Sequence, residues 1–398
     1  MDTAKAKVNA RGRSRIAQGQ AWIFRQEILA GPEVDARTTG PSIVEVQDER
    51  GRPLAIATWA SESPIALRIL EPREKTGALP NLVDWVRPRF ATALHRRQTL
   101  RLNRDAYRVV HGESDGIPGL VVDRYADAAV VQTTSVAMNA NRVALASLAE
   151  ELLGVRLVVA RDDGSARDFE GLPREALILR GQGDTRVVYR LGDNQLETDL
   201  LADSKTGGFL DQADNHALVA NLTPNNARCL DAFTAHGGFA LALARKGGDV
   251  LATDEEDRAV ARATANATRN GLSNLTVRKA NAFDLLRTLE SQHEQFDVVV
   301  LDPPALAKRK GGDTSALRAY HELFLRGLRL TRPDGLAVFC SCSGRVTREM
   351  FDQVVADATR DSGRQAQILL RLGAGMDHPE RVGLSETGHL KCWILRVM

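Results

Sequence analysis

Cys340 and Cys342 stand one residue apart in the segment FCSCSG, at the end of a short apolar run. Such a pair can be core packing, half of a metal site, a disulfide or a nucleophile. A zinc site needs about four ligands with paired spacings, and the remaining Cys and His residues are scattered. A buried cysteine usually behaves as a small hydrophobe, and that role is expected for Cys229, Cys392 and Cys340. No metal is expected, and Cys342 is the candidate nucleophile, with core packing as its alternative.

A thiol nucleophile suits methylation of a pyrimidine carbon. Cytosine C5 is too weakly nucleophilic to take a methyl group unaided, and addition of a thiolate at C6 turns it into an enamine-like nucleophile. Methyl transfer, removal of the C5 proton and expulsion of the thiolate then complete the reaction.

Asp302 and two prolines follow the apolar run VVVL. Because proline lacks the N–H donor of a central strand, this tripeptide predicts a stiff turn that fixes a carboxylate at a pocket mouth. In enzymes that methylate exocyclic amines, the motif normally continues with a Tyr or Phe that stacks on the flipped base, whereas Ala305 stands here. Methylation of an exocyclic amine or another nucleoside atom is therefore the second hypothesis.

A cofactor site is predicted around Asp231, which ends another apolar run, and around Gly237 and Gly238, where a helix opens. Glycines let the backbone approach a ligand, and a helix start offers unpaired N–H groups. Asp254 follows Asp231 by 23 residues, near the spacing of a carboxylate that accepts hydrogen bonds from ribose hydroxyls. Since the G-x-G-x-x-G fingerprint of dinucleotide sites is absent, S-adenosylmethionine (SAM), with a ribose but no phosphate, fits best.

Regular alternation of apolar runs and helical stretches from about residue 226 predicts the elements that position these side chains. The runs are ARCLDAF, DVLATD, LTVRKA, FDVVVLDPP and GLAVFCS. This order predicts parallel strands with right-handed crossovers in a doubly wound α/β sheet, where ligands bind beyond the carboxyl ends of the strands. Asp231, Asp254, Asn281, Asp302 and residues 340–343 are expected at that edge.

The preceding half of the chain is β-rich at first. Strands are predicted at Ile43–Val46 and Leu54–Thr58, on either side of the turn DERGRP. An Arg-rich helical stretch over 81–104, a second β stretch and a helix from about 139 to 153 follow. Three domains are predicted, over residues 1–73, 74–185 and 186–398.

Composition is that of a soluble globular protein, with 398 residues, 43% hydrophobic and 26% charged. No apolar run approaches the roughly 20 residues of a membrane span, and the N-terminus lacks an apolar signal core. We therefore expect a cytoplasmic protein with no membrane contact and reduced cysteines. Net charge is only +2, but basic clusters at residues 5–15, 87–104 and 308–310 could serve a phosphate backbone or be solvated helix faces.

Together, these motifs resemble those of a known family: the bacterial SAM-dependent large-subunit rRNA cytosine-5 methyltransferases with an N-terminal PUA RNA-binding domain. The resemblance covers nearly the whole chain, through GQAWIFRQEI, HGESDGIPGLVVDRY, KTGGFLDQADN, LDPP, FCSCSG, DHP at 377–379 and HLKCWILRVM. It implies a Rossmann-like class I SAM methyltransferase domain, a β-rich PUA domain and an α+β middle domain.

The resemblance implies that Cys342 is the nucleophile forming 5-methylcytosine in 23S rRNA and that Asp302 also holds the cytosine edge. It implies a cofactor pocket lined by Asp231, Phe233, His236, Gly237, Gly238, Phe239, Asp254, Asn281, Ala282, Asp302 and Pro303. Residues implied at the pocket border or the substrate are Lys205, Thr206, Gly208, Asp211, Gln212, Lys308 and Lys310. The implied partner is RNA, either large-subunit rRNA or a ribosomal assembly intermediate, and a homodimer is compatible with it.

Several positions depart from the family pattern. Basic, ring, hydroxyl or acidic side chains usual in the family are replaced here by Ala213, His216, Ala235, His236, Asn281 and Ala305. These departures motivate a third hypothesis, an RNA-binding ribosome-assembly factor with impaired catalysis. Retention of Asp254, Asp302 and Cys342 favours the enzyme.

Overall fold

The computed structural model describes residues 4–306 and 313–398, which form two compact units. The N-terminal unit contains residues up to 189 together with 198–208 and 377–387, and the C-terminal unit contains 190–197, 209–376 and 388–398. Among the described residues, no helix is both long and apolar enough to cross a membrane.

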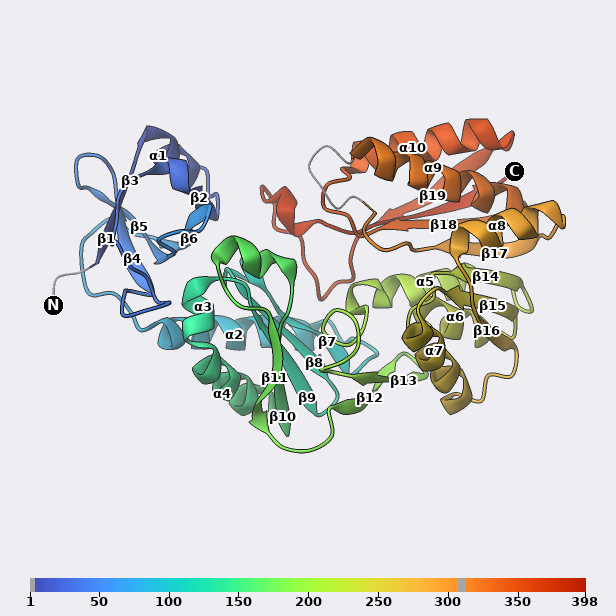
Figure 1. The fold of residues 1–398 in the computed structure, drawn as a ribbon, viewed down its shortest axis with the longest axis horizontal. Coiled ribbons are helices and arrows are strands. Elements are labelled where there is room, and N and C mark those ends of the chain that lie inside the picture. Colours follow the sequence, from blue (N-terminus) through green and yellow to red (C-terminus); the bar gives the residue numbers. More distant parts are fainter. Residues whose placement is uncertain (1–3, 307–312) are drawn as a thin grey trace. The chain divides into compact units, whose positions relative to one another are not determined.

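The first sheet of the N-terminal unit has six strands in the order β2-β6-β5-β4-β1-β3 (Figure 1). Its core contains Val8, Val46, Trp59 and Leu67. The two strands predicted here are confirmed as β4 and β5. The elements are β1 (Lys5–Val8), α1 (Ala10–Ala17), β2 (Trp22–Phe24), β3 (Ile28–Ala30), β4 (Ile43–Gln47), β5 (Pro53–Trp59) and β6 (Ile65–Pro72).

The second sheet of this unit has the order β11-β10-β9-β8-β7, with helices α2 and α4 packed on it. Asn81 caps α2 by accepting hydrogen bonds from the N–H groups of Val83 and Asp84. The elements are α2 (Leu82–Thr99), β7 (Ala106–His111), β8 (Leu120–Tyr125), β9 (Ala128–Thr133), α3 (Val136–Ala140), α4 (Arg142–Leu153), β10 (Leu157–Asp162) and β11 (Glu175–Gly181). The helices predicted over 81–104 and 139–153 are thus present, and the three-domain boundaries stay a prediction. Strands β12 (Arg186–Leu191) and β13 (Asn194–Asp199) form a separate two-stranded sheet.

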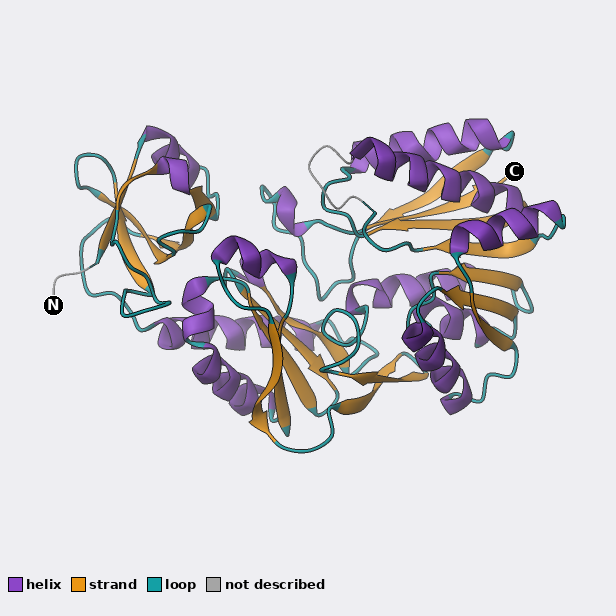
Figure 2. Ribbon diagram, in the orientation of Figure 1, coloured by secondary structure: helices purple, strands orange, loops and turns teal. Residues whose placement is uncertain are grey.

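The C-terminal unit is built on a seven-stranded sheet in the order β16-β15-β14-β17-β18-β20-β19. Strands β14 to β18 are parallel to one another, which confirms the predicted doubly wound sheet. Helices α8, α9 and α10 cover one face and α5, α6 and α7 the other (Figures 1 and 2). The strands are β14 (Arg228–Ala232), β15 (Asp249–Asp254), β16 (Leu275–Lys279), β17 (Phe296–Leu301), β18 (Thr331–Ser341), β19 (Ala366–Leu372) and β20 (Lys391–Val397). The helices are α5 (Ala213–Leu222), α6 (Gly238–Ala244), α7 (Asp257–Arg269), α8 (Ala282–Ser291), α9 (Asp313–Leu330) and α10 (Arg348–Ser362).

The antiparallel strand β20 inserts between β18 and β19. Without it, β18 would be a sheet edge with unpaired backbone groups. In the β18–β20 register, Cys340 lies opposite Cys392 and Ser341 lies opposite Lys391. The strand that leads into Cys342 is therefore held from both sides.

An aromatic cluster supports the same strand from the α9 and α10 side. The rings of Phe324 and Phe339 stack with centroids 4.3 Å apart, and Phe351 packs edge-on against Phe324 and Trp393. All four side chains are buried. Aromatic pairs in this geometry stabilise a fold beyond the apolar area that they bury, so the ends of β17 and β18 sit on a rigid base.

Candidate active site

Three carboxylates come from the carboxyl ends of neighbouring parallel strands. Asp231 is the last residue but one of β14, Asp254 is the last residue of β15, and Asp302 directly follows β17; β14 lies between the other two strands. Burial raises the pKa of Asp231 to about 7, and the negative charges of Asp302 and Asp254 add to that shift. Like charges held this close favour a cationic ligand. SAM, with a sulfonium and an ammonium group, is such a ligand.

Asp231 ties the loop after β14 to helix α6. Its Oδ2 atom accepts hydrogen bonds from Thr234 Oγ1 at 2.7 Å and from the Ala240 N–H at 3.1 Å. Its Oδ1 atom is buried without a hydrogen-bond partner among the described residues. A buried acceptor of this kind suits a protonated carboxyl group or a donor brought by a ligand.

The loop itself has an unusual backbone. Phe233, Ala235 and Gly237 have φ angles of 116°, 48° and 91°, which lie in the left-handed region that only glycine adopts freely. The N–H groups of Phe233 and Thr234 both donate to the Thr253 carbonyl at 2.9 Å. Strained non-glycine residues of this kind concentrate at ligand-binding loops, consistent with the predicted cofactor role of this segment.

Asp254 closes the other side of the loop. Its carboxylate accepts from the Ala235 N–H at 2.9 Å and from the Glu256 N–H at 3.1 Å. The residue is only partly buried. An ionised carboxylate has about four lone-pair sites, so Asp254 is held in place and can still accept from two ribose hydroxyls.

His216 explains why residue 238 is a glycine. A Cβ atom on Gly238 would lie 2.2 Å from His216 Cε1, and the buried His216 ring packs edge-on against Phe239 at 4.4 Å. Helix α5 therefore rests on the start of α6 through this contact.

We expect Gly238→Ala to lower the free energy of unfolding by about 1–3 kcal/mol, since the added methyl group forces the His216 ring to move. Urea denaturation followed by tryptophan fluorescence measures the change. Gly164→Ala is the matched control, because a Cβ there meets nothing within 4 Å. Adding His216→Ala to Gly238→Ala should recover part of the loss, and equal losses in both glycine variants would contradict the packing argument.

The remaining predicted cofactor residues either cap a helix or are buried. Asn281 caps α8, its Oδ1 accepting from the N–H groups of Phe283 at 3.1 Å and Asp284 at 3.3 Å. The side chains of Ala282 and Phe239 belong to the core. The side chains of His236 and Pro303 are also buried. Contacts of these residues with a cofactor stay predictions.

Cys342 differs from the other cysteines. It directly follows β18 and is partly exposed, whereas Cys229, Cys340 and Cys392 are buried, and none of the four is in a disulfide. Burial raises the pKa of the Cys229 thiol to about 12. The predicted core role of the three buried cysteines is confirmed. In the described part of the chain, no group of three or more His, Cys, Asp or Glu side chains could hold a metal ion.

Tyr320, on α9, brings the Asp302 turn and the Cys342 turn together. Its hydroxyl accepts a hydrogen bond from Ser341 Oγ at 2.9 Å and another from the Leu306 backbone. Burial raises the pKa of Tyr320 to about 12, and the nearby Cys342 and Asp302 side chains contribute to that shift. The thiol and the carboxylate therefore both lie near one phenol. Tyr320 was not among the predicted site residues, since its only signal in the sequence is its place on the apolar face of a helix.

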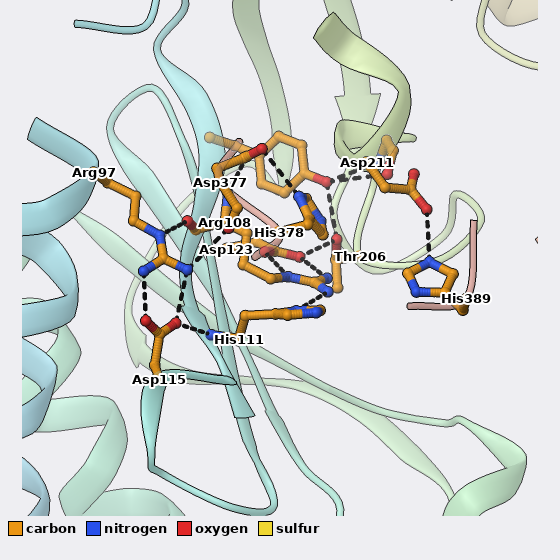
Figure 3. A network of polar contacts seen from close by, with 12 residues as sticks. Arg97, Arg108, His111, Asp115, Asp123, Thr206, Asp211, Asp377, His378 and His389 are labelled. Atoms are coloured by element: carbon orange, nitrogen blue, oxygen red, sulfur yellow. Dashed lines mark hydrogen bonds and ion pairs between the residues drawn. The ribbon is translucent and has the colours of Figure 1, made fainter. Parts of the chain in front are cut away.

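Gln212 and Asp211 are also placed beside the strand ends. Gln212 Nε2 donates to Asp302 Oδ2 at 3.0 Å, and Gln212 Oε1 accepts from Asn215 Nδ2 at 2.6 Å. Asp211 lies 3.2 Å from His389 Nε2 (Figure 3). Of these two predicted border residues, Gln212 thus orients Asp302, whereas Asp211 is paired with His389.

Three other predicted border residues lie in the N-terminal unit. Thr206 Oγ1 donates to Asp123 Oδ2 at 2.7 Å, and the Gly208 N–H donates to the Tyr125 hydroxyl at 2.9 Å. These residues and Lys205 belong to the N-terminal unit, and their substrate role stays a prediction. Lys308 and Lys310 fall outside the described residues.

A buried polar network fixes the DHP segment to the N-terminal unit (Figure 3). Asp377 accepts from Arg104 at 2.9 Å and from the Arg108 N–H at 2.8 Å, and its carbonyl accepts from Arg97 at 2.9 Å. Although burial acts to raise it, the pKa of Asp377 is lowered to about 2 by His378 and Arg104. Asp377 therefore holds the DHP segment in the N-terminal unit.

The raised pKa of Asp231 predicts how stability depends on pH. Between about pH 4 and pH 7, the folded protein holds a proton that the unfolded chain releases. Stability without cofactor should therefore fall as pH rises through this window, by a few kcal/mol. Asp231→Asn, which is neutral at every pH, should flatten the fall. Urea denaturation at pH 4.5 and pH 7.5 measures the free energy of unfolding of both proteins. An equal fall between the two pH values in the wild type and in Asp231→Asn would contradict the raised pKa of Asp231.

Two family models match separate parts of this chain. A family model described as "PUA-like domain" matches residues 6–72, and one described as "Methyltransferase domain" matches residues 224–373. The chain is 34% identical to ribosomal RNA large subunit methyltransferase I of Tolumonas auensis, covering 95% of each chain. It is 34% identical to the protein of that name from Aeromonas salmonicida, covering 97% of this chain and 98% of the relative.

Solved structures share the fold along the whole chain. The crystal structure of SMU.776 complexed with SAH superposes with a TM-score of 0.83 at 17% identity, covering 98% of this chain and 99% of the other. A second structure, from Streptococcus mutans, gives a TM-score of 0.81 at 17% identity over the same shares. Identity this low supports the fold only.

Proposed function

Because this chain belongs to the family of ribosomal RNA large subunit methyltransferase I, we propose that it transfers a methyl group from SAM to C5 of a cytosine in large-subunit rRNA. The single observation that carries the proposal is the partly exposed thiol of Cys342 at the end of β18, near Asp302 and Tyr320. Methylation of an amine or a hydroxyl group needs no such thiol, whereas C5 methylation needs a nucleophile for C6.

The residues around β14 and β15 fit SAM. Bound SAM supplies an electrophilic methyl group on a positively charged sulfur. Asp254 would hold the ribose hydroxyls, and the loop over residues 233–238 would lie along the amino-acid part of the cofactor. The three carboxylates at the strand ends favour its cationic groups.

The proposed reaction uses Cys342 twice. Its thiolate adds to C6, so that an S–C6 bond forms and the electron pair of the C5–C6 bond becomes available at C5. C5 would take the methyl group of SAM, and S-adenosylhomocysteine would leave with the electron pair of the broken S–CH3 bond. C5 would then lose its proton to a base, and the S–C6 bond would break to return the thiolate. Asp302 would accept a hydrogen bond from the cytosine amino group. Gln212, which donates a hydrogen bond to Asp302, would orient its carboxylate.

RNA binding would involve more of the chain than the pocket. The match to a PUA-like domain over residues 6–72 supports a role for the first sheet in gripping RNA, with basic side chains on phosphates. A cytosine stacked in a helix cannot reach Cys342, so the target base would be flipped out.

Product analysis tests the proposal. The purified protein is incubated with methyl-tritiated SAM and large-subunit rRNA, or ribosomal particles, lacking its modification, and the digested nucleosides are separated. We expect the label in 5-methylcytidine. Label in an N-methylated nucleoside would support the exocyclic-amine hypothesis, and RNA binding without transfer on any particle would support the assembly-factor hypothesis.

A further inference from the structure

Two buried side-chain amides form a chain of hydrogen bonds that ends on Asp302. Asn215 and Gln212 are 4% and 1% exposed. Asn215 Nδ2 donates to the carbonyl of Gly373, the residue after β19, at 3.0 Å and to Gln212 Oε1 at 2.6 Å. Gln212 Nε2 in turn donates to Asp302 Oδ2 at 3.0 Å. Because a buried polar group that loses its partner costs free energy, these contacts hold both amides in fixed orientations.

The direction of this chain is set at the end that lies away from Asp302. A backbone carbonyl oxygen can only accept, so the part of the Asn215 amide that faces Gly373 must be its NH2 group. The second N–H of that group then requires an oxygen, which is Gln212 Oε1. The NH2 group of Gln212 is consequently the part that faces Asp302. The chain therefore presents a donor to the carboxylate, and never an acceptor.

A neighbouring thiol agrees with this direction. Burial holds the pKa of the Cys340 thiol well above its usual value, and a hydrogen bond from Gln212 acts to lower it. A hydrogen bond lowers the pKa of an acid when it stabilises the charged form, and an N–H donor does this for a thiolate. The NH2 group of Gln212 is thus turned toward β17 and β18 together.

The two amides do not serve the helix that carries them. Gln212 is the N-cap residue of α5, and Asn215 lies in the first turn of that helix. An N-cap side chain commonly accepts a hydrogen bond from the N–H groups of the first turn. In the described part of the chain, α5 has no side-chain cap of this kind. Both side chains instead connect the residue after β19 with the residue after β17.

We infer that Asn215 and Gln212 are a positioning pair for Asp302. They hold a donor against one oxygen of the carboxylate, and the carboxylate thereby keeps the orientation in which it accepts from the 4-amino group of the target cytosine. Hydrogen bonds to an ionised group are stronger than neutral ones, and a site residue keeps its geometry only when its supporting contacts are fixed. This inference rests on the proposed function and deepens it, because it explains how the amino group is recognised.

The test compares two RNA substrates in single-turnover methyl transfer from methyl-tritiated SAM to the full-length protein's target. Both are large-subunit rRNA fragments that carry the methylated position, with either cytosine or 2-pyrimidinone there. The second base lacks the 4-amino group. With cytosine, we expect Asn215→Leu to slow transfer about tenfold and Gln212→Leu about thirtyfold, because a hydrogen bond to a charged group is weakened or lost. With 2-pyrimidinone, both variants should stay within about threefold of the wild type, since no amino group depends on Asp302 there.

Asn274→Leu is the matched control. Asn274 Nδ2 also donates twice, to the carbonyls of Ala244 at 2.8 Å and Gly248 at 2.6 Å. Asn274 directly precedes β16 and Gly248 directly precedes β15, so these contacts lie at the amino ends of the strands, away from Asp302. The control should leave transfer to both RNAs unchanged.

A distorted fold would slow transfer to both RNAs equally, and that result would overturn the inference, as would unchanged transfer to cytosine. The variant with both leucines should be no slower than Gln212→Leu alone. A further tenfold loss would show that Asn215 does not act through Gln212 and would also overturn the inference. If Asn215→Leu does not fold, Gln212→Leu decides by the same comparison of the two RNAs.

The proposed function and this inference fail in different ways. A wild type that makes no 5-methylcytosine on any rRNA overturns both. A wild type that makes 5-methylcytosine, with leucine variants that slow transfer to both RNAs equally, overturns the inference alone.

Discussion

Replacing Cys342 by alanine is expected to lower methyl transfer to rRNA at least about a thousandfold, because no other group can then activate C5 by adding to C6. The variant should fold normally, since Cys342 is partly exposed and lies beyond the last residue of β18. It should also bind SAM as the wild type does. Single-turnover assays with methyl-tritiated SAM measure the loss, and isothermal titration with SAM verifies the site.

Cys229→Ala is the control for this experiment. Cys229 is a buried thiol on β14, whose pKa is raised to about 12 by burial, and its loss should cost about 1 kcal/mol of stability and little activity. A Cys342→Ala protein that retains activity within about tenfold of the wild type would show that the thiol is not the nucleophile.

Asp302→Asn should lower kcat/KM about a hundredfold, or roughly 2.7 kcal/mol of transition-state stabilisation. The amide keeps an oxygen for the hydrogen bond from Gln212 Nε2, so the turn should keep its shape. It loses the negative charge that would face the cytosine amino group and the cofactor cation. Steady-state kinetics with varied RNA and varied SAM separate the two contributions.

Asp249→Asn serves as the matched control for Asp302→Asn. Asp249 is an exposed carboxylate that begins β15, at the opposite end of the strand from Asp254. Its replacement should leave the kinetics unchanged. Equal losses in both variants would mean that Asp302 acts only through the net charge of the protein.

The sequence allowed prediction of the five parallel strands and of the polar residues that end them. Each strand is a local apolar run, and the polar residue at its end is adjacent in the sequence. Tertiary information was therefore not needed to place four residues at one edge of the sheet: Asp231, Asp254, Asp302 and Cys342. The difference between Cys340 and Cys342 was predictable for the same reason, since only Cys340 belongs to the apolar run.

Contacts between residues distant along the chain could not be predicted in this way. The place of β20 beside β18 depends on pairing between residues some fifty positions apart, and it decides that Lys391 is buried against the turn of Cys342. Tyr320 looks like an ordinary core residue until α9 is packed on β18. The place of segment 377–387 in the N-terminal unit likewise depends on contacts such as that between Asp377 and Arg104, which lie 273 positions apart.

The central claim is a covalent bond between Cys342 and C6 of the target cytosine, and trapping that bond tests it most directly. In RNA containing 5-fluorocytidine, C5 has no proton to lose after methyl transfer, so the thiolate cannot be expelled. We expect a SAM-dependent protein–RNA adduct that survives denaturation and whose cross-linked peptide contains Cys342. Absence of an adduct from a preparation that methylates ordinary rRNA, or an adduct at another residue, would contradict the account.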